Sequence, residues 1–285
     1  MRGNKAAIIL RRDNPPLRLN RYIPLLPPAM RYFLFFSYDG TCYHGWQYQP
    51  NAISVQQKLQ EALSLLLRHP VVIVGAGRTD TGVHARMMVA HFDVVQALEQ
   101  VERMVFRLNG ILPSDISVTA ITPVRPDAHA RFDAVARRYR YYVVMNKSPF
   151  DTRFATRLYY HLDFQAMNEA ALLLLSHQDF GSFCKAGSDN KTTICHVSLA
   201  RWVCQGDGRY YFEIRADRFL RNMVRAIVGT LLDVGRGKIT IEGFLSTLIS
   251  SNGLFSTIIK SHDLPTSTLP VSLLIPAIIA FSKVA

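Results

Sequence analysis

The sequence predicts an α+β fold in which most strands pair in antiparallel hairpins. Helical and strand patterns are mixed in both halves of the chain, without the sustained strand–helix–strand order that a parallel sheet requires. The length of 285 residues, at about 150 residues per domain, indicates two domains. Apolar residues make up 49% and charged residues 19% of the chain, which excludes an intrinsically disordered protein.

In the first half, apolar spacing and turn residues predict five elements after a disordered extension. The extension covers residues 1–30, because proline pairs and arginines interrupt its short apolar runs. Met30 is a candidate start of the natural protein. The first domain, residues 31–130, then contains a strand over 32–38, a helix capped by Ser54, strands over 71–74 and 89–94, and a helix through 104–111.

The second half is predicted to be a similar mixture of strands and helices. A hinge over about 125–135 separates it from the first, because the polar, proline-containing stretch Thr122–Asp127 interrupts the periodic patterns. The second domain, residues 131–252, contains a strand over 139–145, a helix capped by Asp163, a hairpin of strands 197–204 and 210–216, and a helix from about Arg218 to Val234.

The charge balance indicates a polyanionic partner. The chain holds 33 Lys and Arg against 21 Asp and Glu, a formal net charge of +12. Nucleic acid is the first candidate and an anionic membrane surface the second. No apolar run reaches the ~18 residues of a membrane span, so we expect no membrane insertion. The four cysteines show no CxxC spacing and no clustering with histidines at metal-ligand intervals, which predicts reduced thiols in the cytoplasm and no metal site.

The densest group of polar residues is the string Gly77–Ala85, GRTDTGVHA. Its glycines permit a close approach to a ligand, Arg78 can bind phosphate or stack on a base, and Asp80 can act as nucleophile or base. An isolated Arg–Asp pair is more often a solvated turn, so the prediction depends on the whole string. The spacings of phosphate-binding glycine loops, serine-hydrolase elbows and zinc-binding histidine pairs are absent from the sequence, which disfavours those chemistries.

This string resembles the signature G-R-T-D-x-G-V-H of the TruA-type tRNA pseudouridine synthases. The resemblance extends in order over about residues 31–238. Beyond the string it rests on Ser37–Gly40, Tyr43–Gln47, Ser54–Gln56, Val89–Phe92, His129–Ala134, Arg137–Tyr141 and Phe219–Arg225. It implies two similar α+β domains, each a mainly antiparallel sheet with helices on one face, that face each other across a basic catalytic cleft.

The resemblance implies isomerisation of uridine to pseudouridine at positions 38, 39 and 40 of the tRNA anticodon stem-loop, without cofactor or metal. Asp80 is then the catalytic residue, Arg225 pairs with it, Tyr139 packs on the flipped-out target base and Arg78 helps to displace that base. A symmetric homodimer, with tRNA spanning both subunits, is also implied. The route of Asp80 stays open between attack on C1′ of the ribose, attack on C6 of the uracil and abstraction of a ribose proton.

Five further arginines are expected to contact RNA phosphates. A helix that begins near Arg218 places Arg218, Arg221 and Arg225 on one side, where their like charges favour anionic partners. The alternative is an ordinary solvated basic surface. The expected phosphate contacts are Arg137, Arg138, Arg140, Arg218 and Arg221.

The resemblance fades after Lys238. Residues 253–285 form an atypical tail, in which prolines interrupt an apolar run over 269–281. We hypothesise that this ending has been altered, for instance by a change of reading frame. The alternative is a divergent tail that still supplies the family's last strand.

Two other functions compete with the synthase. An RNA-binding protein of the same fold that has lost catalysis is compatible with the tail, but the intact Asp80, Tyr139 and Arg225 disfavour it. Asp-dependent hydrolysis of a glycosidic bond normally requires a second carboxylate, and no clear candidate stands near Asp80 in the sequence.

Overall fold

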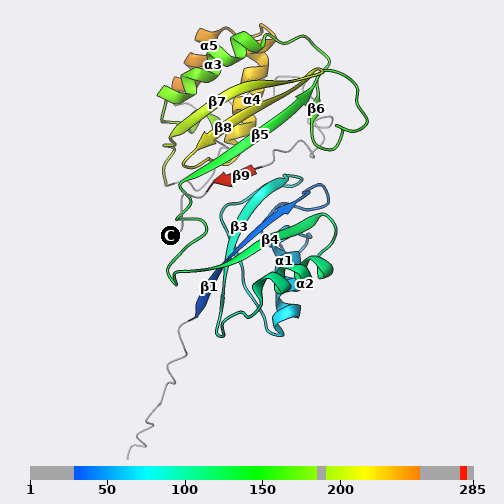
Figure 1. The fold of residues 1–285 in the computed structure, drawn as a ribbon. Helices are drawn as coiled ribbons and strands as arrows, with labels where there is room; N and C mark the ends of the chain where they lie inside the picture. The colour runs from blue at the N-terminus through cyan, green and yellow to red at the C-terminus, as the bar shows by residue number, and fades with distance from the viewer. Residues whose placement is uncertain (1–28, 185–190, 251–276, 281–285) are drawn as a thin grey trace, which may run out of the picture.

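The computed structural model describes residues 29–184, 191–250 and 277–280, which form two packed groups of elements with a short strand between them (Figure 1). The first group consists of β1 (Met30–Tyr38), α1 (Val55–Leu67), β2 (Val74–Gly75), β3 (Ala85–Val94), α2 (Val101–Ile111) and β4 (Ile116–Val124). The second consists of β5 (Ala136–Val144), β6 (Thr156–Arg157), α3 (Phe164–Ser176), the 3₁₀ turn η1 (Gly181–Phe183), β7 (Val197–Gly206), β8 (Arg209–Ala216), α4 (Met223–Gly235) and α5 (Ile241–Ile249).

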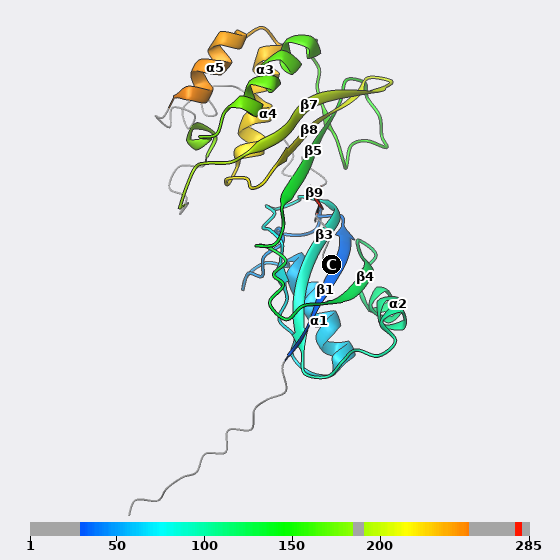
Figure 2. The same cartoon turned by 60° about the vertical axis from the view of Figure 1, so that its left-hand side comes forward.

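One sheet runs through both groups in the order β4-β1-β3-β9-β5-β8-β7, with β2 added to β3 and β6 added to β5. Only the β3–β9 and β5–β6 pairs are parallel, so the described part of the chain has the mainly antiparallel α+β architecture that the sequence predicts. Figure 2 shows α3, α4 and α5 together on one face of the second group's strands.

The tail contributes the strand that joins the two groups. β9 (Ala277–Ala280) pairs with β3 through Met87 and Ile278, and with β5 through a run that ends at Tyr139 and Ala277. The strand formed by residues 277–280 therefore agrees with the alternative of a divergent tail that still supplies a strand. The rest of the predicted tail, residues 253–276 and 281–285, lies outside the described residues, as do residues 1–28 of the extension predicted over 1–30. Met30 itself begins β1.

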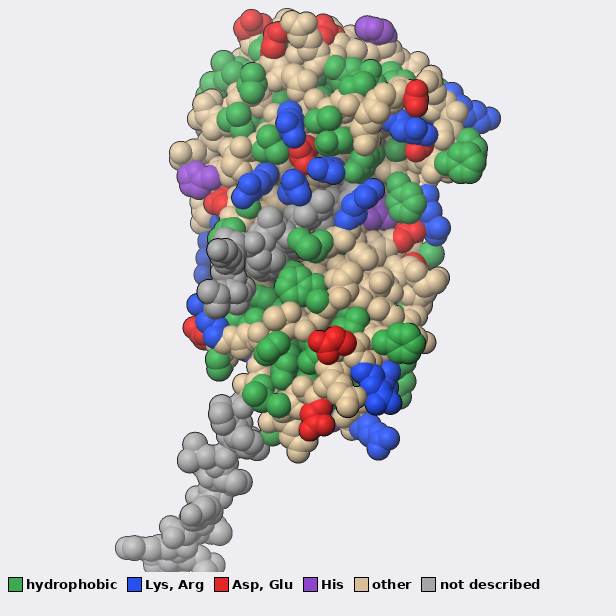
Figure 3. All heavy atoms as spheres, in the orientation of Figure 1, with side chains coloured by type: hydrophobic (Ala, Val, Ile, Leu, Met, Phe, Trp, Pro, Cys, Tyr) green, Lys and Arg blue, Asp and Glu red, His purple; other side chains and the backbone are tan. Residues whose placement is uncertain are grey.

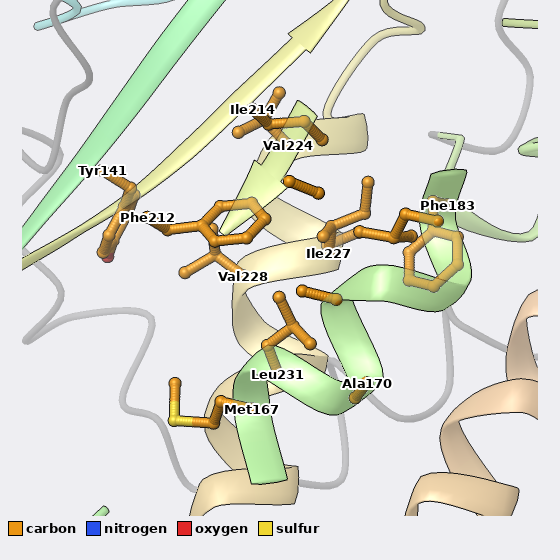
Figure 4. Packing of buried hydrophobic residues seen from close by; sticks show 14 of the residues in the cluster. Tyr141, Met167, Ala170, Phe183, Phe212, Ile214, Val224, Ile227, Val228 and Leu231 are labelled. Carbon is orange, nitrogen blue, oxygen red and sulfur yellow. The ribbon is translucent and has the colours of Figure 1, made fainter. Parts of the chain in front are cut away.

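The buried apolar side chains form two clusters, one in each group. In the first, Leu59 and Leu63 of α1 and Leu108 of α2 pack against β1, β3 and β4. Figure 4 shows the second, in which strand residues face α3 and α4. Its labelled members are Tyr141, Phe212 and Ile214 from the sheet, Met167 and Ala170 from α3, Val224, Ile227, Val228 and Leu231 from α4, and Phe183.

Several predicted boundaries are wrong, for identifiable reasons. The strand predicted over 71–74 is reduced to β2, although Val71 and Ile73 are buried. The sequence analysis missed β4, whose Pro123 interrupts the pattern but is tolerated because β4 lies at the edge of the sheet. It also missed α5, which Thr240 caps by accepting the N–H of Gly243.

The helix predicted from Arg218 begins five residues later, at Met223. Asn222 has a φ of 67°, a left-handed conformation that asparagine tolerates and a continuous helix does not. The N–H of Met223 bonds to the carbonyl of Leu220, so residues before α4 form a separate turn. Arg218 and Arg221 therefore lie on a loop and do not share a helix face with Arg225.

Candidate active site

Asp80 is an exposed residue of the loop between β2 and β3, here called the Asp80 loop (residues 77–83). The first group holds this loop through its backbone. The N–H of Trp46 donates to the carbonyl of Thr79 (3.2 Å) and the N–H of Gly82 donates to the carbonyl of Tyr43 (3.1 Å). The hydroxyl groups of Tyr38 and Thr79 share a hydrogen bond of 2.9 Å. The residues around Tyr38 and Tyr43 thus support the loop, and they are here called the bed of the loop.

Gly45 shows why a glycine stands in this bed. Its φ of +87° is in the left-handed region, and a Cβ added there would collide with the carbonyl oxygen of Thr79. A Cβ at Gly40 would likewise collide with the carbonyl oxygen of Val83. The sequence analysis quoted both glycines in its motifs without assigning them this packing role.

Arg225 of α4 reaches across from the second group to Asp80. Its Nη2 lies 3.7 Å from Oδ2 of Asp80, and the two side chains are 41% and 51% exposed. The pair is therefore open to solvent and to a ligand, and it contributes about 1 kcal/mol or less to stability. Because the carbonyl of Asp80 accepts the N–H of Val83 (3.1 Å), the loop forms a turn that presents this carboxylate outward.

Tyr139 of β5 completes the group of residues that the resemblance singles out. It lies on the face of β5 that packs on the second core cluster, as do Tyr141 and Val143. Its ring meets that of Phe219 edge to face, with 4.9 Å between centroids. Burial raises the pKa of the Tyr139 phenol; the positive charge of Arg137 opposes this rise, and the negative charge of Asp80 adds to it.

The structure brings Asp80, Arg225 and Tyr139 into one neighbourhood, because Asp80 pairs with Arg225 and acts electrostatically on Tyr139. Phe219 joins this neighbourhood through its ring contact with Tyr139, a role that was not predicted for it. A signal was available, since Phe219 stands six residues before Arg225 in a quoted motif. Arg78 is exposed on the Asp80 loop. Arg218 is half-buried and Arg221 exposed on the loop before α4.

Arg137 forms hydrogen bonds inside the protein. Its guanidinium group donates to three backbone carbonyls, those of Asp217 (2.6 Å), Arg131 (2.7 Å) and Ala76 (3.1 Å). Ala76 directly precedes the Asp80 loop, so Arg137 of β5 ties the start of this loop to the second group. Contact with an RNA phosphate stays a prediction for Arg137, whose donors already have these partners.

Arg138 and Arg140 point away from this neighbourhood. Residues alternate between the two faces of a strand, so both lie on the face of β5 opposite Tyr139. There they surround Glu213 of β8, which is 1% exposed, with nitrogen–oxygen distances of 3.6 Å for Arg138 and 2.8 Å for Arg140. Arg201 of β7 adds a third contact at 3.1 Å. Figure 3 shows basic side chains gathered over these strands.

Glu213 stays ionised among these arginines. Burial by itself raises the pKa of its carboxyl group, but hydrogen bonds from Arg140 and Arg201 and the charge of Arg138 outweigh it, so the pKa falls below its ordinary value. One carboxylate balances one of three guanidinium charges, which leaves this face of the sheet positive.

The described residues offer neither a membrane-spanning helix nor a cluster of metal ligands. No helix among them is both long and apolar enough to cross a membrane. No group of three or more His, Cys, Asp or Glu side chains in this part of the chain is arranged to hold a metal ion.

Comparison with known proteins identifies the family. A family model described as tRNA pseudouridine synthase matches residues 34–133 and 170–253. The chain is 58% identical over 216 residues to tRNA pseudouridine synthase A of Bacteroides thetaiotaomicron, covering 75% of this chain and 80% of that protein. It is 53% identical to the enzyme of the same name from Parabacteroides distasonis, over 76% of this chain and 86% of that one. The corresponding protein of Bacteroides fragilis is 52% identical, over 79% and 89%. The chain belongs to the tRNA pseudouridine synthase family of isomerases.

Proposed function

We propose that this protein converts uridine to pseudouridine at positions 38, 39 and 40 of the tRNA anticodon stem-loop. The observation that carries the proposal is the exposed ion pair between Asp80 and Arg225, with the aromatic pair Tyr139 and Phe219 beside it. A carboxylate, a cation that orients it and an aromatic surface are the groups that a reaction on an extruded base requires. The family relationship supports tRNA as the substrate.

The reaction is an isomerisation that exchanges one glycosidic bond for another. The bond between C1′ of the ribose and N1 of the uracil breaks, the base turns, and a bond between C1′ and C5 forms. The hydrogen on C5 leaves as a proton and N1 gains a proton, so no atom or electron is lost. Asp80 is the group that starts this sequence, either as nucleophile towards C1′ or C6 or as the base that removes a ribose proton.

The target base must leave its stack before its glycosidic bond is accessible. The proposal assigns to Tyr139 the packing on the extruded base, and the edge-to-face contact of its ring with Phe219 supports this role. Burial keeps the pKa of its phenol above the ordinary value, so this surface is uncharged at neutral pH. Arg78, exposed on the Asp80 loop, is the candidate that displaces the base or holds a neighbouring phosphate.

The partners follow from charge and family. A net charge of +12 favours a polyanion such as tRNA, with Arg218 and Arg221 on the loop before α4 as the nearest further phosphate contacts. Residues 31–130 and 131–252 act as two domains that face each other across a basic cleft containing Asp80. The family resemblance favours a homodimer that works in the cytoplasm, with one tRNA spanning both subunits.

The proposal is tested by mapping the product. Anticodon stem-loop RNAs with a single uridine at position 38, 39 or 40 are incubated with the protein and assayed for pseudouridine by carbodiimide-dependent stops of reverse transcription. We expect stops at these positions and none at a uridine moved to position 36. Tight binding of tRNA without any stop supports instead the alternative of an RNA-binding protein that has lost catalysis.

A further inference from the structure

A segment of the second group contacts the first group beside the Asp80 loop. It comprises residues 145–155, between β5 and β6, and is here called the strap (Figure 1). Its far end is anchored where β6 pairs with β5, through Thr156 and Val143, and where Asp151 forms a 3.1 Å ion pair with Arg209 of β8. The strap is therefore a fixed part of the second group.

Two neighbouring residues of the strap contact the first group. Nε of Arg153 lies 3.0 Å from Oδ2 of Asp39. The ring of Phe154 packs on the ring of His84, with 4.9 Å between centroids. Asp39 follows β1, whereas His84 directly follows the Asp80 loop, so the strap contacts both the bed and the end of this loop.

Asp39 connects the strap to His84. Its Oδ1 accepts hydrogen bonds from the N–H (3.0 Å) and the hydroxyl (2.6 Å) of Thr41 and lies 2.9 Å from Nδ1 of the buried His84. Burial raises the pKa of Asp39, but the hydrogen bonds from Thr41 and nearby positive charge, including that of Arg153, outweigh it and lower the pKa. Asp39 is thus an anion that lies beside the end of the loop and pairs with Arg153.

The other end of the Asp80 loop has a matching support. Arg137 of β5 donates to the carbonyl of Ala76, the residue that precedes the loop, at 3.1 Å. Two arginines of the second group therefore fix the loop at its start and at its end, while Arg225, also from the second group, pairs with Asp80 in its middle. Arg225 thus contacts the loop itself, Arg137 contacts the residue before it, and Arg153 reaches the residue after it, His84, through Asp39.

We infer that Arg153, through Asp39 and His84, and Arg137, through Ala76, are positioning residues that hold Asp80 in register with Tyr139 and Arg225. This inference rests on the proposed role of Asp80. Its physical basis is that Tyr139 and Arg225 belong to one group and Asp80 to the other. An error of about 1 Å in their relative placement costs roughly a hundredfold in rate, so a link between the groups at the loop itself controls the chemistry.

The experiment compares matched variants of the full-length protein. Arg153→Gln and Asp39→Asn each remove the link, Arg153→Lys keeps its charge, and the double variant Arg153→Gln/Asp39→Asn tests whether the two act together. Arg125→Gln is the control, because Arg125 is 59% exposed and its ion pairs with Asp127 and Asp133 lie away from the loop. Arg137→Lys keeps a charge but loses the planar fork, and thermal melts check that it folds.

Two readouts are needed. The first is the single-turnover rate of pseudouridine formation, with the Kd for tRNA measured in parallel. We expect Arg153→Gln and Asp39→Asn to lower this rate roughly tenfold or more with less than about a threefold change in Kd, and the double variant to lose no more than either single one. Arg153→Lys should recover most of the rate, Arg137→Lys should lower it, and Arg125→Gln should leave it unchanged.

The second readout is hydrogen exchange of residues 77–84, which does not depend on activity. We expect faster exchange of the Gly82 and Val83 amides in Arg153→Gln, because their hydrogen bonds to Tyr43 and Asp80 open more often. If Arg153→Gln changes neither the single-turnover rate nor the exchange of these amides, the inference is wrong. This also holds if the Kd for tRNA rises in that variant. If the parent protein itself forms no pseudouridine, the proposed function fails, and the exchange measurement alone decides the role of Arg153.

Discussion

Nη2 of Arg225 on α4 lies 3.7 Å from Oδ2 of Asp80 on the loop between β2 and β3, so one ion pair joins the two groups of elements at the candidate site. Both side chains are about half exposed. A pair this exposed adds little to stability, and its proposed role is to orient the carboxylate.

Replacing Arg225 by glutamine should therefore lower activity strongly while changing stability little. We expect the free energy of unfolding to change by less than about 1 kcal/mol, because the pair is solvent-exposed. The single-turnover rate should fall at least roughly a hundredfold, because Asp80 loses the cation that orients it. Arg225→Lys should recover only part of the rate, since lysine lacks the planar fork. Urea unfolding and a pseudouridine assay on the same samples check both, and an unchanged rate in Arg225→Gln would count against the site.

Gly45 offers a test of the bed under the Asp80 loop, with Gly206 as its control. Both have a φ of +87°, but a Cβ at Gly206 meets nothing within 4 Å, whereas at Gly45 it collides with the carbonyl of Thr79. Alanine at either position should cost about 1 kcal/mol of backbone strain. Only Gly45→Ala should also displace Thr79 and lower the rate of catalysis. Equal activity of the two variants would show that Asp80 does not depend on this contact.

His91 of β3 makes stability depend on pH. It is 5% exposed, its Nδ1 accepts the N–H of Ala130 (3.2 Å), and burial, together with the nearby charge of Arg31, lowers its pKa to about 4. In the unfolded chain this pKa is about 6.5. The stabilising contribution is therefore complete above about pH 6.5 and is lost as the pH falls towards 4.

We expect His91 to remove about 2 kcal/mol from the free energy of unfolding between pH 7 and pH 5. His91→Gln keeps an acceptor for Ala130 but does not titrate, so its stability should fall less over this interval. Urea unfolding of both proteins at pH 5, 6 and 7 measures the difference. Parallel curves for the two proteins would mean that His91 does not carry this dependence.

The sequence was sufficient for most of the architecture because local signals coincide with it. Ser54 and Asp163 cap their helices as predicted, each accepting the N–H three residues on. The hairpin predicted from strands over 197–204 and 210–216 is present as β7 and β8, which turn at Asp207 and Gly208. The failures occur where tertiary context overrides local pattern: Pro123 is tolerated because β4 is an edge strand, and Asn222 interrupts a helix that the apolar spacing favours.

The candidate site shows the same division. The string that contains Asp80 identified the loop, but its spacing contains no information on which side chains approach it from other elements. The role of Arg137 could not be predicted, because two of its three carbonyl partners, Asp217 and Ala76, come from distant parts of the chain. Arg138 and Arg140 are adjacent to Tyr139 in sequence, yet the alternation of a strand places them on the opposite face, around Glu213.

The central claim, that Asp80 carries out uridine isomerisation, is tested most directly by tritium release from tRNA labelled at C5 of uridine. Forming the bond between C1′ and C5 frees that hydrogen, whereas binding or hydrolysis of the glycosidic bond does not. We predict release by the parent protein and none by Asp80→Asn, with both proteins binding tRNA and melting alike, because Asp80 is half exposed. Equal release by the two proteins, or no release by the parent despite tRNA binding, would contradict this assignment.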